Sequence, residues 1–350
     1  MSTIYDLIAM GRRLGASDVH LSEGLPLQIR VDGRLAPSPY QLAEGEARAI
    51  ILGLLTERRR DALLEQGIDA DFSLTTPDGC RQRVNVFSQQ GKVAATLRLL
   101  NDTIPTLAAL GLPPVLENLS DQPRGLILLA GPTGSGKSTT LAAMIEHINT
   151  TRPEHIVTIE DPIEYAYTGK LALIHQREVG RDVPSFAAAL RSVLREDPDV
   201  ILVGEMRDYE TISAAVTAAE TGHLVMSTLH TIGAAQTIDR IIDVCPPNAQ
   251  PQIRTQLSGV LRGVITQQLL PRVGGGRCPA TEVLVTTDAV STLIRDNKCH
   301  QIGTAMQSGA ALGMHSLNAD LARLVRQGQI TRETALRATI DKSDLALYLQ

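Results

Sequence analysis

The sequence predicts an α/β protein in which a doubly wound, mostly parallel sheet follows a smaller α+β domain. The chain has 350 residues, more than the ~150 residues of one typical domain, so we expect two domains. Apolar strand patterns alternate with helical patterns after residue 122, whereas the first third mixes short strand patterns with turn residues. We expect the first domain at residues 1–100, a linker at residues 101–121, and the second domain, which ends in a helical region, at residues 122–350.

The first domain is predicted to hold a short helix, several strands and a longer helical stretch. The apolar positions Ile4, Leu7 and Ile8 favour an amphipathic helix that packs on its own domain rather than on a membrane. Asp32-Gly33 is a strong signal for a two-residue hairpin turn. The strands are expected at residues 18–21, 26–31, around Leu35, and at 70–74, 80–88 and 92–100, with the helical stretch at residues 44–66.

Three arginines of the first domain are candidates for phosphate contact. Arg81 and Arg83 alternate along one strand, so they share a face of the sheet, and Arg98 lies in a later strand. Arginines on a sheet face are usually solvated charges. The alternative is that they reach a phosphate bound by a neighbouring subunit.

A phosphate-binding loop opens the second domain. The sequence G-x-x-x-x-G-K-[ST] is matched at every position, between an apolar run at residues 126–129 and a helical pattern at residues 139–148. Glycines let backbone N–H groups turn toward an anion, and the helix N-terminus adds the positive end of its dipole. A chance glycine turn would lack this flanking strand and helix. The predicted nucleotide-binding residues are Gly131, Pro132, Thr133, Gly134, Ser135, Gly136, Lys137, Ser138 and Thr139.

Lys137 and Ser138 have distinct expected roles in this loop. The Lys137 ammonium is expected to contact the β- and γ-phosphates, and the Ser138 hydroxyl to bind Mg²⁺. Downstream, the apolar strand at residues 199–205 ends in Glu205, which would lie beside the metal and the attacking water. The alternative for Glu205 is an ordinary loop acid or a neighbour of a helix cap.

Further charged and imidazole groups follow the predicted strands of the second domain. A β-branched strand at residues 155–159 ends in Glu160 and Glu164. Pro184 opens a helix in which Arg191 and Arg195 lie one turn apart. His223 and His230 bracket the next strand. One histidine is most often structural, but two beside a phosphate site are better candidates for sensing the γ-phosphate.

Composition narrows the class of function. Aromatic residues make up 3% of the chain, Trp is absent and the formal net charge is −5, which disfavours a protein that stacks or wraps nucleic acid. The four cysteines are scattered without a C-x-x-C pair, which disfavours a paired-cysteine zinc site or a disulfide framework. No apolar run reaches the ~20 residues that span a bilayer and no signal peptide is recognised, so we expect a cytoplasmic protein without stable membrane insertion.

Together these residues resemble the hexameric ATPases of the secretion superfamily and, within it, the type IV pilus retraction ATPases. Four motifs carry the resemblance: a Walker A motif at residues 131–138, an Asp box at 158–164, a Walker B motif at 196–208 and a His box at 221–231. The resemblance covers nearly the whole chain. It implies a RecA-like P-loop NTPase domain preceded by a PAS-like domain, which begins near residues 17–21.

The resemblance also implies an activity, an assembly and a location. It implies a homohexamer that hydrolyses ATP with Mg²⁺ at sites between the two domains that adjoin the next subunit. Such a motor would power pilus retraction and twitching motility from the cytoplasmic side of the inner membrane at the pilus base, through a platform protein of that membrane. Nucleic acid is not an expected partner.

The resemblance assigns roles to the candidate residues at matching positions. Glu205 would be the general base or the acid that orients water, and Glu160 and Glu164 would assist metal or water, with Glu160 as a Mg²⁺ ligand. The groups that would contact or sense phosphate are Lys137, His223, His230, Arg191 and Arg195, with Arg81, Arg83 and Arg98 as further candidates.

Two departures from the family patterns bear on the branch. The additional amino-terminal region and the tetracysteine zinc element of assembly ATPases are missing, which favours the retraction branch. The retraction motif Ala-Ile-Arg-Asn-Leu-Ile-Arg-Glu is half kept, as Ala-Val-Ser-Thr-Leu-Ile-Arg-Asp at residues 289–296, so a divergent pilus or type II secretion paralogue with an assembly or accessory role is the alternative. A nucleic-acid-translocating RecA-type ATPase and a nucleotide-dependent scaffold with little turnover are weaker alternatives, because of the composition and of Glu205 respectively.

Overall fold

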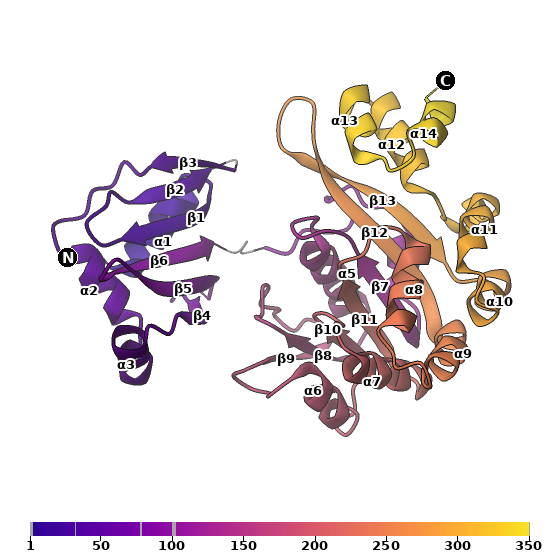
Figure 1. Cartoon of the computed structure of the whole chain (residues 1–350), viewed down its shortest axis with the longest axis horizontal. Coiled ribbons are helices and arrows are strands. Elements are labelled where there is room, and N and C mark those ends of the chain that lie inside the picture. The colour runs from indigo at the N-terminus through magenta and orange to yellow at the C-terminus, as the bar shows by residue number, and fades with distance from the viewer. Residues whose placement is uncertain (1–2, 32, 78, 100–102, 350) are drawn as a thin grey trace. The chain divides into compact units, whose positions relative to one another are not determined.

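The computed structural model of the protein describes residues 3–31, 33–77, 79–99 and 103–349. The chain divides into two compact units (Figure 1). One is built mainly from an antiparallel sheet and the other from a mostly parallel sheet flanked by helices, so the α/β class predicted from the sequence is confirmed. The first unit is Met1–Thr103 with Pro162–Ala166, and the second is Ile104–Asp161 with Tyr167–Gln350.

The first unit is a six-stranded antiparallel sheet with the strand order β3-β2-β1-β6-β5-β4. Its apolar face and three helices share one core. Its elements are α1 Ile4–Arg13, β1 Ala16–Ser22, β2 Gln28–Val31, β3 Arg34–Pro37, α2 Glu46–Gly53, α3 Glu57–Gln66, β4 Ala70–Thr75, β5 Arg81–Gln89 and β6 Lys92–Leu99.

Local sequence signals explain most of this unit. Thr3 and Asp6 form a reciprocal capping box at the start of α1, and Leu7 is fully buried in the core of the unit, so the predicted packing of this helix on its own domain is confirmed. The helical stretch expected at residues 44–66 is two helices, because the chain turns after Gly53 and extends again before α3. The expected hairpin turn includes Asp32, which lies outside the described residues; the strands around it pair antiparallel.

The second unit is a seven-stranded sheet with the order β13-β12-β7-β11-β10-β8-β9. Its strands are parallel except at one edge, where β12 and β13 form an antiparallel hairpin. The strands are β7 Gly125–Ala130, β8 His155–Glu160, β9 Leu173–Glu178, β10 Val200–Val203, β11 Leu224–Leu229, β12 Leu261–Pro271 and β13 Arg277–Val285.

Helices cover both faces of the parallel sheet. In β7, Leu126 and Leu128 belong to one core, whereas Ile127 and Leu129 belong to the other, as the period of two of a strand requires. No helix of the described part of the chain is long and apolar enough to cross a membrane. The helices are α4 Val115–Ser120, α5 Lys137–Thr151, α6 Phe186–Val193, α7 Tyr209–Glu220, α8 Ala234–Asp243, α9 Gln250–Val260, α10 Asp288–Arg295, α11 Ile302–Ser308, α12 Leu317–Arg326, α13 Arg332–Ala338 and α14 Lys342–Tyr348, with short 3-10 turns at Cys299–Gln301 and Ala310–Leu312.

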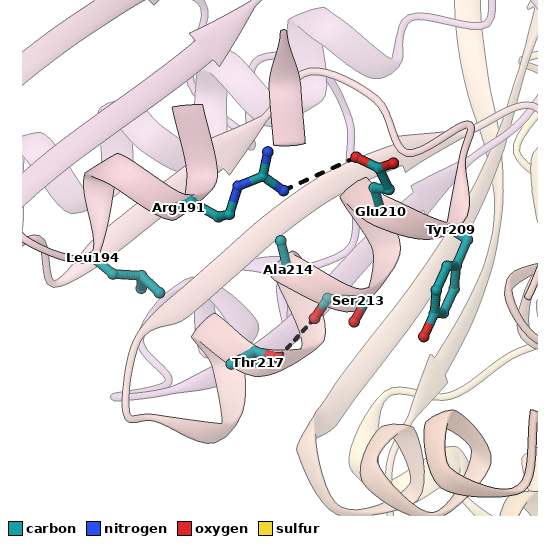
Figure 2. Close-up of a pocket in the computed structure, with 7 residues that line it drawn as sticks. All are labelled: Arg191, Leu194, Tyr209, Glu210, Ser213, Ala214 and Thr217. Atoms are coloured by element: carbon teal, nitrogen blue, oxygen red, sulfur yellow. Dashed lines mark hydrogen bonds and ion pairs between the residues drawn. The ribbon is translucent and has the colours of Figure 1, made fainter. Parts of the chain in front are cut away.

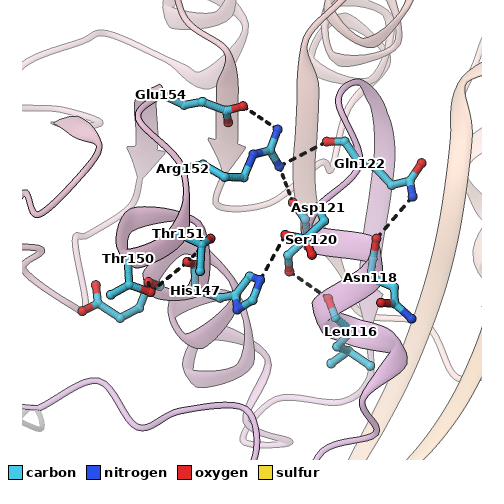
Figure 3. A network of polar contacts seen from close by, with 11 residues as sticks. Leu116, Asn118, Ser120, Asp121, Gln122, His147, Thr150, Thr151, Arg152 and Glu154 are labelled. Carbon is cyan, nitrogen blue, oxygen red and sulfur yellow. Dashed lines mark hydrogen bonds and ion pairs between the residues drawn. The ribbon is translucent and has the colours of Figure 1, made fainter.

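Most of the stretch that we expected as a linker, residues 101–121, belongs to the second unit. Leu116 of α4 is fully buried in the core that also contains Ile127. The Arg152 guanidinium, just after α5, donates to the Ser120 carbonyl oxygen at 2.8 Å and pairs with the Glu154 carboxylate, which ties α4 to the sheet (Figure 3). The unit boundary therefore falls between residues 103 and 104; residues 101 and 102 lie outside the described part.

Candidate nucleotide site

The register of the parallel sheet brings four loops to one edge. Ala130 at the end of β7 pairs with Leu229 at the end of β11. Val203 at the end of β10 pairs with Ser227 on one side and with Ile159 on the other. The residues that follow these four strands therefore meet at the carboxyl edge of the sheet, where ligands bind in open α/β folds.

The predicted phosphate loop lies at this edge, between β7 and α5. Lys137 begins α5 and is buried, and its ammonium folds back over its own loop. There it donates to the carbonyl oxygens of Gly131 at 2.8 Å and Pro132 at 3.0 Å. The next residue, Ser138, is exposed on the first helical turn. The cation and the helix N-terminus thus face one small loop, which suits a phosphate group.

The three glycines of the loop are required by its backbone conformation, and two of them also by packing. A Cβ on Gly131 would lie 2.3 Å from the backbone oxygen of Gln267, and one on Gly136 would lie 2.8 Å from the Gln267 amide nitrogen. Gly134 has open space around it, but its φ of +78° is in the left-handed region that favours glycine. All three glycines have a positive φ, and at Gly131 and Gly136 the lack of room for a Cβ adds a packing requirement to the conformational one.

Gln267 of β12, which the sequence analysis did not single out, holds this loop. Its amide nitrogen donates to the Ser135 carbonyl oxygen at 2.7 Å, and its amide oxygen accepts from the Thr140 hydroxyl at 2.8 Å. Both Gln267 and Thr140 are buried. The signal in the sequence is a polar run, Thr266-Gln267-Gln268, between the apolar residues Ile265 and Leu269.

Glu205 follows β10 and is fixed by backbone contacts on both sides. The Gly204 N–H donates to the Ile159 carbonyl oxygen at 2.8 Å, and the Met206 N–H donates to the Thr228 carbonyl oxygen at 3.2 Å. The Thr228 hydroxyl also donates to the Gly204 carbonyl oxygen. The chain at Glu205 is thus held to both neighbouring strands, and its side chain is only 19% exposed.

One oxygen of the Glu205 carboxylate carries the contacts of this group. Its Oε2 atom lies 2.7 Å from Arg207 Nε and 3.5 Å from His230 Nε2. His230 follows β11, so the predicted pair Glu205 and His230 is brought together. Arg207 was not predicted as a site residue, and its side chain is 72% exposed. Its position in the Walker B motif, two residues after Glu205, is the one signal in the sequence that could have indicated it. Among the described residues, no side chain contacts Oε1 through a hydrogen bond or ion pair that would occupy it.

The other two predicted carboxylates are placed differently. Glu160, at the end of β8, is buried, and its Oε1 atom accepts from the Thr158 hydroxyl at 2.7 Å and the Gln176 amide at 3.2 Å. It therefore lies at the carboxyl edge with one oxygen already hydrogen-bonded. Glu164 lies in Pro162–Ala166, the segment assigned to the first unit.

His223 lies at the opposite edge of the sheet from His230. It precedes β11, and the six residues of that strand span roughly 20 Å. Its Nδ1 atom lies 2.9 Å from the Ala218 carbonyl oxygen near the end of α7, so this ring caps a helix. Within one chain, the structure does not bring His223 to the phosphate loop.

Of the two arginines expected on one helix, only Arg191 lies within it. Arg191 is exposed on α6, with its guanidinium 4.0 Å from the Glu210 carboxylate across a groove between α6 and α7 (Figure 2). The helix ends at Val193, because the Arg195 N–H bonds to the Ser192 carbonyl oxygen in a tighter turn. Arg195 is exposed, and its side chain makes no hydrogen bond or ion pair with the residues that the structure describes.

Two of the three candidate arginines of the first unit, Arg83 and Arg98, form ion pairs within that unit. Arg83 and Arg98 face each other directly across β5 and β6. Arg83 pairs with Asp71 at 2.7 Å, and Arg98 pairs with the buried Asp18 at 3.1 Å. Each of the two opposed cations is thus balanced by an acid on its outer side, which offsets the repulsion of like charges across a strand pair. Arg81 is partly buried at the start of β5.

The residues at the carboxyl edge fit a nucleotide with Mg²⁺. The Ser135 hydroxyl oxygen is buried inside the loop and has no hydrogen-bond partner among the described residues, as expected of a group that a ligand oxygen would satisfy. Mg²⁺ usually takes one or two protein oxygens together with waters and phosphate oxygens. The exposed Ser138 hydroxyl and the carboxylates of Glu160 and Glu205 offer that set of oxygens.

Comparison with known proteins shows which family the chain resembles over nearly its whole length. Residues 5–345 match the family described as "Type II/IV secretion system protein". The chain is 48% identical over 335 residues to the "Type IV pilus retractation ATPase PilT" of Pseudomonas aeruginosa, covering 95% of this chain and 96% of the relative. It is 47% identical over 312 residues to the "Twitching motility protein" of Neisseria gonorrhoeae, covering 89% of this chain and 83% of the relative.

A solved structure agrees with these sequence matches. The crystal structure of the pilus retraction motor PilT with bound ADP superposes with a TM-score of 0.91 at 46% identity, covering 99% of this chain and 100% of that one. The resemblance inferred from the four motifs is therefore confirmed. The chain belongs to the type II/IV secretion system protein family and is similar to the pilus retraction ATPases.

Proposed function

We propose that this chain hydrolyses ATP at the carboxyl edge of β7, β11 and β10. The observation that carries the proposal is that the buried Lys137 follows β7 and Glu205 follows β10, two strands separated only by β11, so that both residues lie at the carboxyl edge of the sheet. On nucleotide binding, the Lys137 ammonium exchanges its contacts with the Gly131 and Pro132 carbonyls for phosphate oxygens. A charge-assisted contact to phosphate is stronger than the neutral ones it replaces.

Glu205 orients or deprotonates the attacking water in this proposal. Its Oε2 atom is held by Arg207 and lies near His230, which fixes the carboxylate and directs Oε1 toward water. His230 detects the γ-phosphate in this proposal, and its Nε2 atom, 3.5 Å from the Glu205 carboxylate, supports that role. Positioning and electrostatic stabilisation carry most of the catalysis of phosphoryl transfer.

Mg²⁺ would be held by Ser138, with Glu160 as a further ligand or as a support for its waters. When bound, the metal neutralises charge on the β- and γ-phosphates. Thr158 and Gln176 hold the Glu160 carboxylate at the end of β8 through its Oε1 atom.

We propose further that the active form is a homohexamer in which Arg195 reaches the site of a neighbouring subunit. The exposed and unpaired guanidinium supports this role, because a transition state that spreads charge over the γ-phosphoryl oxygens favours an added arginine. Sedimentation of the full chain with and without nucleotide tests the assembly. A ring of six is expected, and a chain that stays monomeric while hydrolysing ATP would contradict it.

The cellular role that we propose is retraction of a type IV pilus, from the cytoplasmic side of the inner membrane and through a platform protein there. The names of the relatives in Pseudomonas aeruginosa and Neisseria gonorrhoeae support this role. The test is expression of this chain in a Pseudomonas aeruginosa strain that lacks PilT, with Glu205→Gln as the matched inactive control. Restored twitching by the unaltered chain alone is expected.

An accessory role is the second candidate, because the motif at residues 289–296 keeps only half of the retraction pattern. The chain is also 39% identical over 338 residues to the type IV pilus ATPase PilU of Pseudomonas aeruginosa. Rescue of a strain lacking PilU, with none in a strain lacking PilT, would favour this accessory role over the main motor.

A further inference from the structure

We infer that Gln267 is a positioning residue that holds the phosphate loop in its nucleotide-binding shape. The inference rests on the proposed ATPase function. Gln267 belongs to β12, the strand next to β7, and contacts the loop from outside the Walker A motif. No motif of the sequence assigns it a role.

The amide of Gln267 joins the two parts of the phosphate-binding device. Through its nitrogen it holds the Ser135 carbonyl oxygen in the loop, and through its oxygen it holds the Thr140 hydroxyl on the first turn of α5. The loop supplies N–H groups to a phosphate, and the helix supplies its N-terminus. One side chain therefore fixes the distance between the two.

The same residue also shapes the ends of the loop by contact. Gly131 lies against the Gln267 backbone oxygen, and Gly136 lies against its amide nitrogen, so closely that neither position has room for a Cβ. Leu269, two residues further on the same face of β12, also lies near Gly136. The loop is therefore seated on β12 at both ends, while Gly134 at its tip has open space.

Only an amide meets both demands at this buried position. A carboxylate would accept from Thr140 but would set a negative charge against the Ser135 carbonyl oxygen, and an apolar side chain of similar length would leave both partners unpaired. A buried polar group without a hydrogen-bond partner costs free energy. The loop would therefore shift until its unpaired groups find other partners. Without Gln267, the binding shape must then form at the moment the nucleotide binds, which weakens affinity.

This role predicts a specific kinetic pattern. ATP and ADP both place a β-phosphate in the loop, so a disordered loop weakens the binding of both and leaves the later chemical step largely intact. A loss of interactions shared by ground state and transition state raises KM and leaves kcat unchanged. A residue that only keeps the chain folded would instead lower the amount of active enzyme, so kcat per chain would fall at constant KM.

The test is the full chain with Gln267→Met, and Gln268→Met as the matched control. Gln268 is the same residue type one position along β12, so it lies on the other face of the strand, and its side chain is not part of the loop contacts. For Gln267→Met we expect the Kd for ADP and the KM for ATP to rise about tenfold each, with kcat within about twofold of the unaltered chain. For Gln268→Met all three values should stay within about twofold.

Unchanged KM with reduced kcat in Gln267→Met, or the same change in both variants, would overturn the inference. If Gln267→Met does not fold, Thr140→Val removes one of the two hydrogen bonds and should raise KM about threefold, whereas Thr140→Ser should not; equal KM values for these two variants would also overturn it. Lys137→Ala separates the inference from the proposed function. If Lys137→Ala binds ADP as tightly as the unaltered chain, the proposed nucleotide site is wrong. If Lys137→Ala loses ADP affinity but Gln267→Met keeps it, the site stands and the positioning role of Gln267 is wrong.

Discussion

The carboxyl and amino edges of the parallel sheet both carry histidines, but these histidines make different contacts at the two edges. At the carboxyl edge, His230 lies beside Glu205 and the loop that follows β7. At the amino edge, His223 caps α7, and His155 and His175 bond to each other at 2.9 Å. Histidines alone therefore do not mark the site; the direction of the strands does.

The difference has a physical origin in the parallel arrangement. Every strand that points the same way ends at one edge, and the helix that follows a strand begins there with unpaired N–H groups. A phosphate finds donors at that edge, whereas the other edge presents helix carboxyl ends, which attract donors such as the His223 ring.

The largest effect is expected from Lys137→Ala. Removing the only cation that the loop itself supplies should reduce nucleotide affinity and bring turnover close to background, about 10³-fold or more below the unaltered chain. Titration with a fluorescent ADP and a phosphate-release assay measure the two effects. Lys170→Ala is the control, since Lys170 is an exposed lysine paired with Glu146. Normal affinity together with normal turnover in Lys137→Ala would remove this residue from the site.

Arg195→Ala tests whether the nucleotide site at the carboxyl edge needs an arginine from a neighbouring subunit. If Arg195 acts on a neighbouring subunit, turnover should fall about 10³-fold, the scale of a lost arginine contact to the γ-phosphate, while nucleotide binding is largely kept. Mixing this variant with Glu205→Gln should then restore some activity, because some interfaces hold both intact groups. No rescue in rings shown to be mixed would place Arg195 in its own chain's site or in a step shared by the whole ring.

Glu205→Gln separates binding from chemistry at the carboxyl edge. The amide keeps the shape of the side chain but loses the negative charge, so ATP should still bind while hydrolysis falls by about 10²-fold or more. Measuring ATP binding and phosphate release on one preparation checks both halves. Preserved kcat would make Glu205 a structural acid and leave Glu164 as the next candidate base.

Local sequence signals were enough to predict the phosphate loop and Glu205 as residues of the carboxyl edge. The phosphate loop is contiguous and stands between a strand and a helix, and Glu205 ends an apolar strand, so both could be found without knowledge of the sheet order. The packing of Leu7 in α1 followed from the helical period alone. These features depend on residues that are close in the sequence.

Contacts between distant segments could not be predicted in this way. Gln267 meets Ser135 across 132 positions of sequence, and that contact exists only because β12 lies next to β7. Gln176, which holds Glu160, lies on β9, a strand whose mixed pattern gave no signal. The expected linker was misplaced for the same reason: the apolar side chains of α4 pack against strands that follow it in the sequence.

The central claim is that chemistry takes place at the carboxyl edge and not at the amino edge, and the two histidines that bracket β11 test it most directly. The measurement is the steady-state turnover of His230→Gln and His223→Gln, made side by side at saturating ATP. Loss of the imidazole near Glu205 should lower turnover about tenfold, the scale of one hydrogen bond to a charged group, whereas His223→Gln should stay within about twofold. Equal losses in the two variants, or a larger loss in His223→Gln, would contradict the account.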